Sequence, residues 1–167
     1  MPMRLRLLFP LLALLLLVSC DRKGRMASVA EENIFRTADH PEGLVIKAVS
    51  EPDSAFGVNY LTQHEVNSLA SLMKQVTEVI MERTNGMTVF NPDDRYVMDL
   101  AERQMHAMTE LRGMVYKTNE KRKWSGWKLR IDYETSGSDG LKRRTERWFF
   151  FDKDCKTILR SFELPLP

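Results

Sequence analysis

The sequence predicts an α+β fold, in which a helical hairpin is followed by an antiparallel β-meander within a single small domain. Two segments in the middle of the chain repeat apolar residues every three or four positions, which is typical of amphipathic helices. After Gly113 the period changes to two, which is typical of strands with one buried face. Because the helical segments precede the strands of the meander and do not alternate with them, an α+β fold is favoured over a parallel sheet.

The first helical segment carries signals for both of its ends. Thr62 and Glu65 have the spacing of a capping box, and Leu61 and Val66 have that of a hydrophobic staple. Gly86, preceded by an asparagine, suits the left-handed conformation that ends a helix. The expected inner face consists of Val66, Leu69, Leu72, Met73, Val76, Val79 and Ile80.

The second helix is expected to begin at Asn91 as N-cap, with Pro92 in the first helical position, and to close at Gly113. The connection to the first helix is short, which favours an antiparallel hairpin. Its expected inner face consists of Val97, Leu100, Ala101, Met105, Met108 and Leu111. The shared core is expected to contain Val76, Ile80, Leu100 and Met108.

One strand is expected at residues 44–49, and the meander at residues 127–134, 141–151 and 156–164. In the first strand of the meander, apolar residues alternate with charged ones, so Lys128 and Arg130 are expected on an outward face. With the turn at residues 136–140, positions whose numbers add to about 276 face each other, which pairs Arg130 with Glu146.

The segment 148–151 breaks this alternation, because Trp148 is followed by three phenylalanines. A strand that is apolar on both faces has to be covered on both sides. Helices can cover one face. The other face requires a second layer, the strand at residues 44–49, or a partner.

The first residues have the three zones of a secretory signal. Arg4 and Arg6 are followed by an apolar run at residues 7–18 and then by a polar stretch. The run has the ~7–15 residues of a signal peptide and falls short of the ~20 that span a bilayer. The run ends at Leu17, Val18, Ser19 and Cys20, which resemble the lipobox of bacterial lipoproteins.

This resemblance implies that a diacylglycerol is attached to the sulfur of Cys20 and that the chain is cleaved before it. Asp21 is similar to the signal that retains enterobacterial lipoproteins in the inner membrane, which implies the periplasmic face of that membrane in a Gram-negative cell. We therefore expect a signal peptide at residues 1–19, a lipidated flexible tether at residues 20–42 and the α+β domain at residues 43–167. A flexible tether of this length has a reach of about 25 Å.

Charge is segregated along the mature chain. Removal of residues 1–19 takes away Arg4 and Arg6 and leaves 23 basic and 23 acidic residues. Residues 20–116 hold 10 of the basic and 15 of the acidic ones, and residues 117–167 hold 13 and 8. The second part is therefore the candidate to face an anionic partner.

A basic and aromatic cluster is the candidate binding site. No carboxylate is expected across the sheet from four cations, which are Lys121, Arg122, Lys123 and Arg143. Trp124 directly follows Lys123 in the chain, which places an aromatic ring beside the first three cations. An exported protein does not meet nucleic acid, so lipid phosphate, an acidic cell-wall polymer or an acidic protein surface is the expected partner.

Motifs for catalysis and metal binding are weak. Ser71 and Lys74 match a Ser-x-x-Lys motif but lie within a helix, and the three histidines are scattered, so no metal or cofactor is expected. Cys155 is expected to be a partly buried structural thiol. The sequence favours a non-catalytic periplasmic binding or adaptor module. The alternative is a small envelope enzyme or inhibitor with a pocket between the helical hairpin and the sheet.

Overall fold

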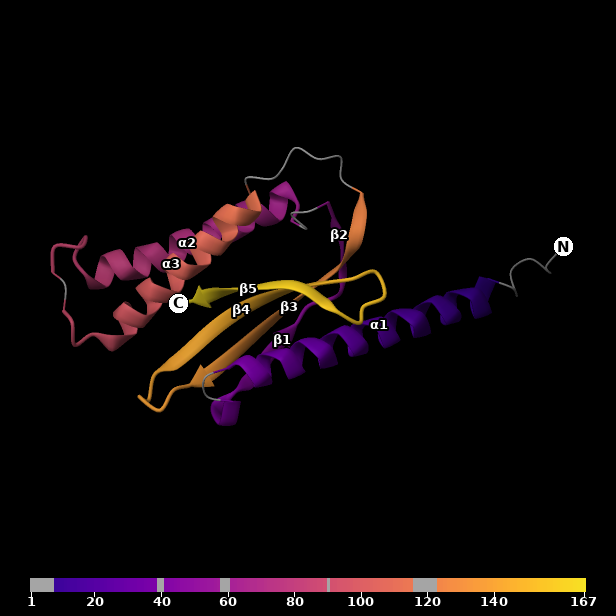
Figure 1. Ribbon diagram of the computed structural model, residues 1–167, viewed down its shortest axis with the longest axis horizontal. Helices are drawn as coiled ribbons and strands as arrows, with labels where there is room; N and C mark the ends of the chain where they lie inside the picture. The colour runs from indigo at the N-terminus through magenta and orange to yellow at the C-terminus, as the bar shows by residue number, and fades with distance from the viewer. Residues whose placement is uncertain (1–7, 39–40, 58–60, 90, 116–122) are drawn as a thin grey trace.

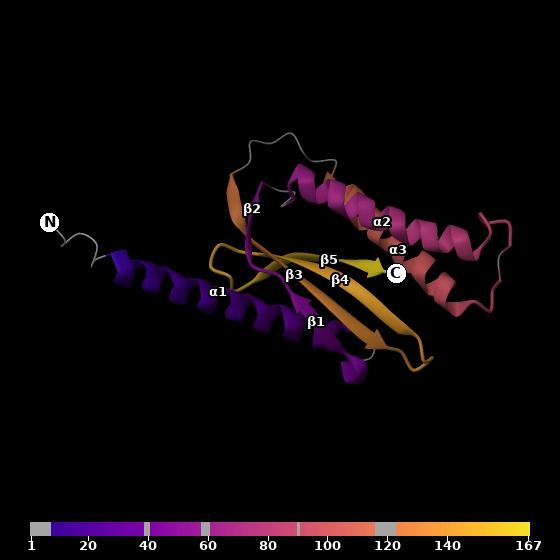
Figure 2. The ribbon, with the colours of Figure 1, turned by 180° about the vertical axis from the view of Figure 1, so that it is seen from behind.

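The computed structural model confirms the α+β fold. It describes residues 8–38, 41–57, 61–89, 91–115 and 123–167, with the backbone alone for residues 8–21 and 115. The elements follow one another as α1 (Leu8–Thr37), a 3₁₀ turn (Pro41–Gly43), β1 (Val45–Val49), β2 (Asp53–Phe56), α2 (Gln63–Arg83), α3 (Arg95–Val115), β3 (Trp124–Ser136), β4 (Lys142–Phe151) and β5 (Ile158–Leu166). Helix α1 runs along one side of the sheet and the α2–α3 hairpin lies on the other (Figures 1 and 2).

The sheet is antiparallel, with the order β1-β3-β4-β5 and with β2 also paired to β3. The expected register between β3 and β4 is wrong by two residues, because Ser136 pairs with Lys142 and leaves a five-residue turn. Arg130 therefore lies opposite Trp148, and its ion pair with Glu146 is diagonal, at 3.6 Å. A shift of two keeps every side chain on its expected face.

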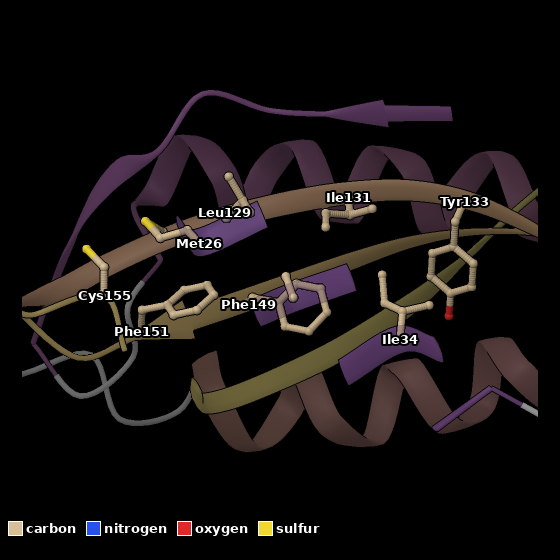
Figure 3. Packing of buried hydrophobic residues seen from close by; sticks show 9 residues of the cluster. Met26, Ile34, Leu129, Ile131, Tyr133, Phe149, Phe151 and Cys155 are labelled. Atoms are coloured by element: carbon tan, nitrogen blue, oxygen red, sulfur yellow. The ribbon is translucent and has the colours of Figure 1, made fainter. Parts of the chain in front are cut away.

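The expected flexible tether at residues 20–42 is wrong for most of its length, because residues 20–37 belong to α1. Met26, Ala30 and Ile34 recur every four residues and are fully buried. They pack on the face of the sheet that carries Leu129, Ile131, Tyr133, Phe149 and Phe151. Figure 3 shows Met26 and Cys155 at one end of this cluster, and Ile34 and Tyr133 at the other.

Helix α1 also explains why β4 is apolar on both faces. Phe149 and Phe151 belong to the cluster beneath α1, whereas Trp148 and Phe150 belong to the cluster beneath the α2–α3 hairpin. The second layer that the sequence required is thus the N-terminal helix. The sheet lies between two helical layers.

Helix α2 confirms its expected capping box. The Glu65 amide donates to Thr62 Oγ1 at 3.2 Å, and the Thr62 amide donates to Glu65 Oε2 at 2.6 Å. Asn85 and Gly86 after its end are left-handed, with φ of 48° and 67°. Helix α3 begins later than expected, at Arg95, because the Val97 amide donates to Asp94 Oδ1, and Asn91 caps only the preceding turn.

The inner face of α3 differs from the expected one. The buried positions alternate in steps of three and four, and they are Val97, Leu100, Gln104, Ala107, Leu111 and Met114. Met105 and Met108 were expected inside but are 66% and 49% exposed, since each follows a buried position by one residue and so points about 100° away from it. Buried Gln104 joins the helices by donating to Thr77 Oγ1 at 2.6 Å and to the Met73 carbonyl at 2.9 Å.

Candidate functional site

The expected basic face does not form as one surface. Lys121 and Arg122 lie outside the described residues. Lys123 and Trp124 are exposed where β3 begins, and Trp124 is 40% exposed. Arg143 pairs with Thr135 near the other end of β3. At ~3.3 Å per residue, about 36 Å of strand separates the two ends, so the expectation of a shared site is wrong.

Arg143 is also not an unpaired cation. Its Nε lies 2.6 Å from Asp99 Oδ1, and its Nη2 lies 2.7 Å from Asp139 Oδ2. Hydrogen bonding to this guanidinium and to the Leu141 amide lowers the pKa of Asp139 to about 2. Asp99 belongs to α3, and the alternation of residues along the strands predicts cross-strand partners only, so it could not predict this ion pair.

A polar cleft of about 440 Å³ lies between α3, the end of α1 and the sheet. Tyr133 donates to Glu163 Oε1 at 2.9 Å, and Arg147 Nη1 lies 2.9 Å from the same oxygen. Burial, followed by the Glu163 charge, raises the pKa of Tyr133 well above its ordinary value, so the phenol stays protonated. The lining residues are Thr37, Ala38, Asp99, Glu102, Arg103, His106, Tyr133, Thr135, Arg143, Thr145 and Glu163.

Most charges of this cleft already neutralise one another. Arg103 donates to Thr145 Oγ1 at 2.6 Å and to the Arg144 carbonyl at 2.9 Å, and it lies 3.5 Å from Asp99. His106 is exposed at the rim. A small polar ligand would have to displace these internal contacts, so the cleft resembles a structural network more than a preorganised binding site.

Lys128 is a buried cation that the sequence pattern placed on the outside. Its side chain is 3% exposed, and its Nζ lies 2.5 Å from Glu65 Oε1 and 3.2 Å from Asp53 Oδ2. The same carboxylate of Glu65 closes the capping box of α2. This ion pair therefore ties the first turn of α2 to the sheet.

Trp148 lies on the hairpin side of the sheet and takes no part in an exposed surface. Trp148 is buried against Phe162, with ring centroids 6.0 Å apart, and its Nε1 donates to Glu146 Oε1 at 2.6 Å. Burial raises the pKa of this Glu146 carboxyl.

Cys155 is more deeply buried than the partly buried thiol that was expected. It is buried in the cluster beneath α1, and burial is the main cause that raises its thiol pKa. A raised pKa disfavours the reactive thiolate.

An apolar groove of about 290 Å³ opens between α2 and α3. Its floor is formed by buried Leu69 and Leu111, and exposed Met108 and Arg112 stand at its edge. Exposed methionines make adaptable contact surfaces, because the side chain is unbranched and polarisable. The groove is lined by Val66, Leu69, Ala70, Met73, Met108, Leu111 and Arg112.

Within the described ranges, no three His, Cys, Asp or Glu side chains are placed to hold a metal ion. In the part of the chain that the structure describes, no helix is long and apolar enough to cross a bilayer. No family model, no curated protein and no solved structure matches the chain.

Proposed function

We propose that the protein is a lipoprotein, anchored through acyl chains on Cys20, that acts as a non-catalytic binding module in the cell envelope. The lipobox resemblance supports the anchor, and Asp21 supports the periplasmic face of the inner membrane in a Gram-negative cell. Two or three acyl chains anchor a protein firmly, because each buried methylene contributes about 0.8 kcal/mol.

The apolar groove between α2 and α3 carries the binding role. A hairpin of two 21-residue helices with an open apolar groove suits an amphipathic helix that lays its apolar face between them. Arg112 at the edge favours a partner helix with acidic residues beside its apolar face. We infer that the occupant is such a helix from another envelope protein.

A photocrosslinking residue at Ala70 tests this role in intact cells. Ala70 lines the groove, whereas its exposed neighbour Ser71 does not, so Ser71 is the matched control. We expect Ala70 to crosslink to an amphipathic helical segment of one envelope protein, and Met108→Glu to abolish both the crosslink and complementation of a deletion strain. Equal crosslinking at both positions, or full function of the folded Met108→Glu protein, would count against the groove.

The anchor is tested separately. Cys20→Ala is expected to leave an unprocessed precursor that takes up no labelled fatty acid, because the thiol is the acyl acceptor. Asp21→Ser is expected to move the protein outward in an enterobacterial host. Fatty-acid labelling of the Cys20→Ala protein would refute the lipobox assignment.

The polar cleft favours a second candidate, an envelope enzyme or inhibitor that binds a small polar ligand between α3 and the sheet. This candidate ranks below the binding module, because the cleft's arginines and Glu163 are held by internal ion pairs. Loss of function in His106→Ala with an intact groove crosslink would reverse the ranking.

A further inference from the structure

We propose that the end of the domain beside Cys20 is a membrane-contact surface that binds anionic phospholipid headgroups. The inference rests on the proposed lipid anchor and adds to it a defined orientation of the folded domain on the bilayer. We call this region the end surface. It comprises Arg22, Phe56, Lys123, Trp124, Trp127 and Lys153.

Aromatic rings and cations alternate in direct contact across the end surface. The Arg22 guanidinium lies 3.9 Å from the Trp127 ring centroid, and Lys153 Nζ lies 5.1 Å from that of Trp124. The two tryptophan rings meet edge to face at 5.8 Å. Phe56 of β2, which is 40% exposed, pairs with Trp124 of the neighbouring strand β3. The structure thus gathers four separate segments into one surface.

The anchor position lies next to this surface. Cys20 precedes Arg22 by two residues within the α1 backbone, which corresponds to about 3 Å along a helix axis. Arg22 and Arg25 also lie close enough to the β4–β5 turn for their charges to act on the pKa of Cys155. In Figure 1 this turn lies beside α1, and the α2–α3 hairpin extends toward the opposite end of the molecule. Acyl chains on Cys20 would therefore hold the end surface at the bilayer.

The chemistry of the end surface matches the headgroup region. Tryptophan favours the membrane interface because its ring is apolar and its N–H is polar, and basic side chains attract anionic lipids. The Trp127 N–H already donates to the Lys153 carbonyl at 3.2 Å, so this ring can enter the interface with its donor satisfied. The nearby carboxylate of Asp152 accepts the amides of Lys156 and Thr157, and Glu51 is paired with Lys23.

The occupant is a bilayer and not a protein, because the anchor leaves no room for a partner of domain size at this end. With α1 packed on the sheet from Met26 onward, no flexible segment lies between the described end surface and Cys20. Each cation near an anionic surface strengthens attraction by about fivefold, and salt weakens this attraction.

Tryptophan quenching by brominated lipid tests the proposal on the acylated protein. The protein is reconstituted into vesicles of brominated phosphatidylcholine, either alone or with an equal part of phosphatidylglycerol. Buried Trp148 supplies a constant background. We expect the tryptophan fluorescence of the wild type to be quenched more strongly in vesicles that contain phosphatidylglycerol than in vesicles of phosphatidylcholine alone. This difference should disappear at high salt. It should also disappear in the Lys123→Glu/Lys153→Glu variant. Arg95→Glu/Lys142→Glu reverses two exposed cations elsewhere and is expected to behave as wild type.

The outcomes separate this surface from the anchor. Intact mass spectrometry of the membrane-extracted protein reports acylation of Cys20, and an unmodified cysteine would refute the anchor and with it the orientation. If the cysteine is acylated, two results would overturn the proposed end surface without affecting the anchor. One is weak quenching of the wild type in vesicles that contain phosphatidylglycerol. The other is equal quenching of the two double variants when both have the thermal midpoint of the wild type.

Discussion

Lys128 shows how one buried charge constrains the side chains around it. Its amino group is held by Glu65 from α2 and Asp53 from β2. A buried ion pair contributes little net stability, but removal of one partner leaves an uncompensated charge. Glu65 is the more important partner, because it is mostly buried and Asp53 is largely exposed.

Glu65→Gln is therefore expected to destabilise the protein by about 1.5–3 kcal/mol in urea unfolding, the range for a hydrogen bond to a charged group. Glutamine still closes a capping box, so the loss reports on the charge. Glu78→Gln is the control, since its exposed pair with Lys74 contributes about 0.5 kcal/mol or less. Equal effects of the two substitutions would contradict a structural role for the Lys128 pair.

The Asp139 carboxyl makes stability depend on acid pH. Its pKa is lowered from 3.8 to about 2 in the folded protein. A lowered pKa stabilises the fold above the unfolded value, and this contribution is lost as pH falls from 3.8 toward 2. The urea midpoint of the wild type should therefore fall more steeply over this window than that of Asp139→Asn. Parallel curves for the two proteins would show that the Arg143 pair does not act on stability.

Single residues were predictable from the sequence when their partners were local. The Thr62–Glu65 capping box is of this kind. Arg143 and Lys128 were misplaced, because each has an ion-pair partner on a helix far away in the chain, Asp99 and Glu65 respectively. The second partner of Arg143, Asp139, lies in the β3–β4 turn, where a cross-strand pattern pairs no residues. Cross-strand alternation alone cannot show which face a helix will cover.

At the scale of elements, α3 shows that hydrophobicity alone does not choose the buried face. Leu100 is buried, whereas Met105 is exposed although both are apolar. The buried face includes Gln104, a polar residue whose hydrogen bonds to α2 satisfy its donor group. The sequence pattern favoured methionine over glutamine at this point and therefore missed the junction.

Leu100→Ala is expected to cost about 2–5 kcal/mol, the range for a truncated core side chain. Met105→Ala, on the exposed side of the same helix, should change stability by about 0.5 kcal/mol or less. Chemical denaturation of both variants gives the comparison. A small loss at Leu100 together with a large one at Met105 would place the opposite face of α3 in the core.

The elements differ in how far the sequence specified them. Strong caps and clear periods predicted α2 and the meander, and the structure confirms both. Helix α1 was missed because only Met26, Ala30 and Ile34 contact the sheet deeply, and one of these three is a small alanine. The register of β3 and β4 depends on the length of the turn between them. The Asp-Gly pair marks the place of this turn but does not fix its length, so the predicted register differs from the observed one by two residues.

At the scale of the molecule, α1 joins the proposed anchor directly to the core. The two apolar faces of β4 are covered by α1 and by the α2–α3 hairpin, so the sheet requires both layers. The groove opens between α2 and α3. This hairpin lies on the opposite side of the sheet from α1 (Figures 1 and 2). A binding module built in this way would hold its partner at a fixed height and orientation above the membrane.

Hydrogen exchange of the acylated protein in vesicles tests this arrangement most directly. Residues 26–37 are helical, and Met26, Ala30 and Ile34 pack on the sheet, so the amides of this segment should be protected to a degree comparable with those of β3 and β4. Protection of this kind would show that the folded domain begins beside Cys20. Complete exchange of residues 26–37 at the first time point, with the sheet still protected, would instead show a flexible tether and contradict the fixed placement on the membrane.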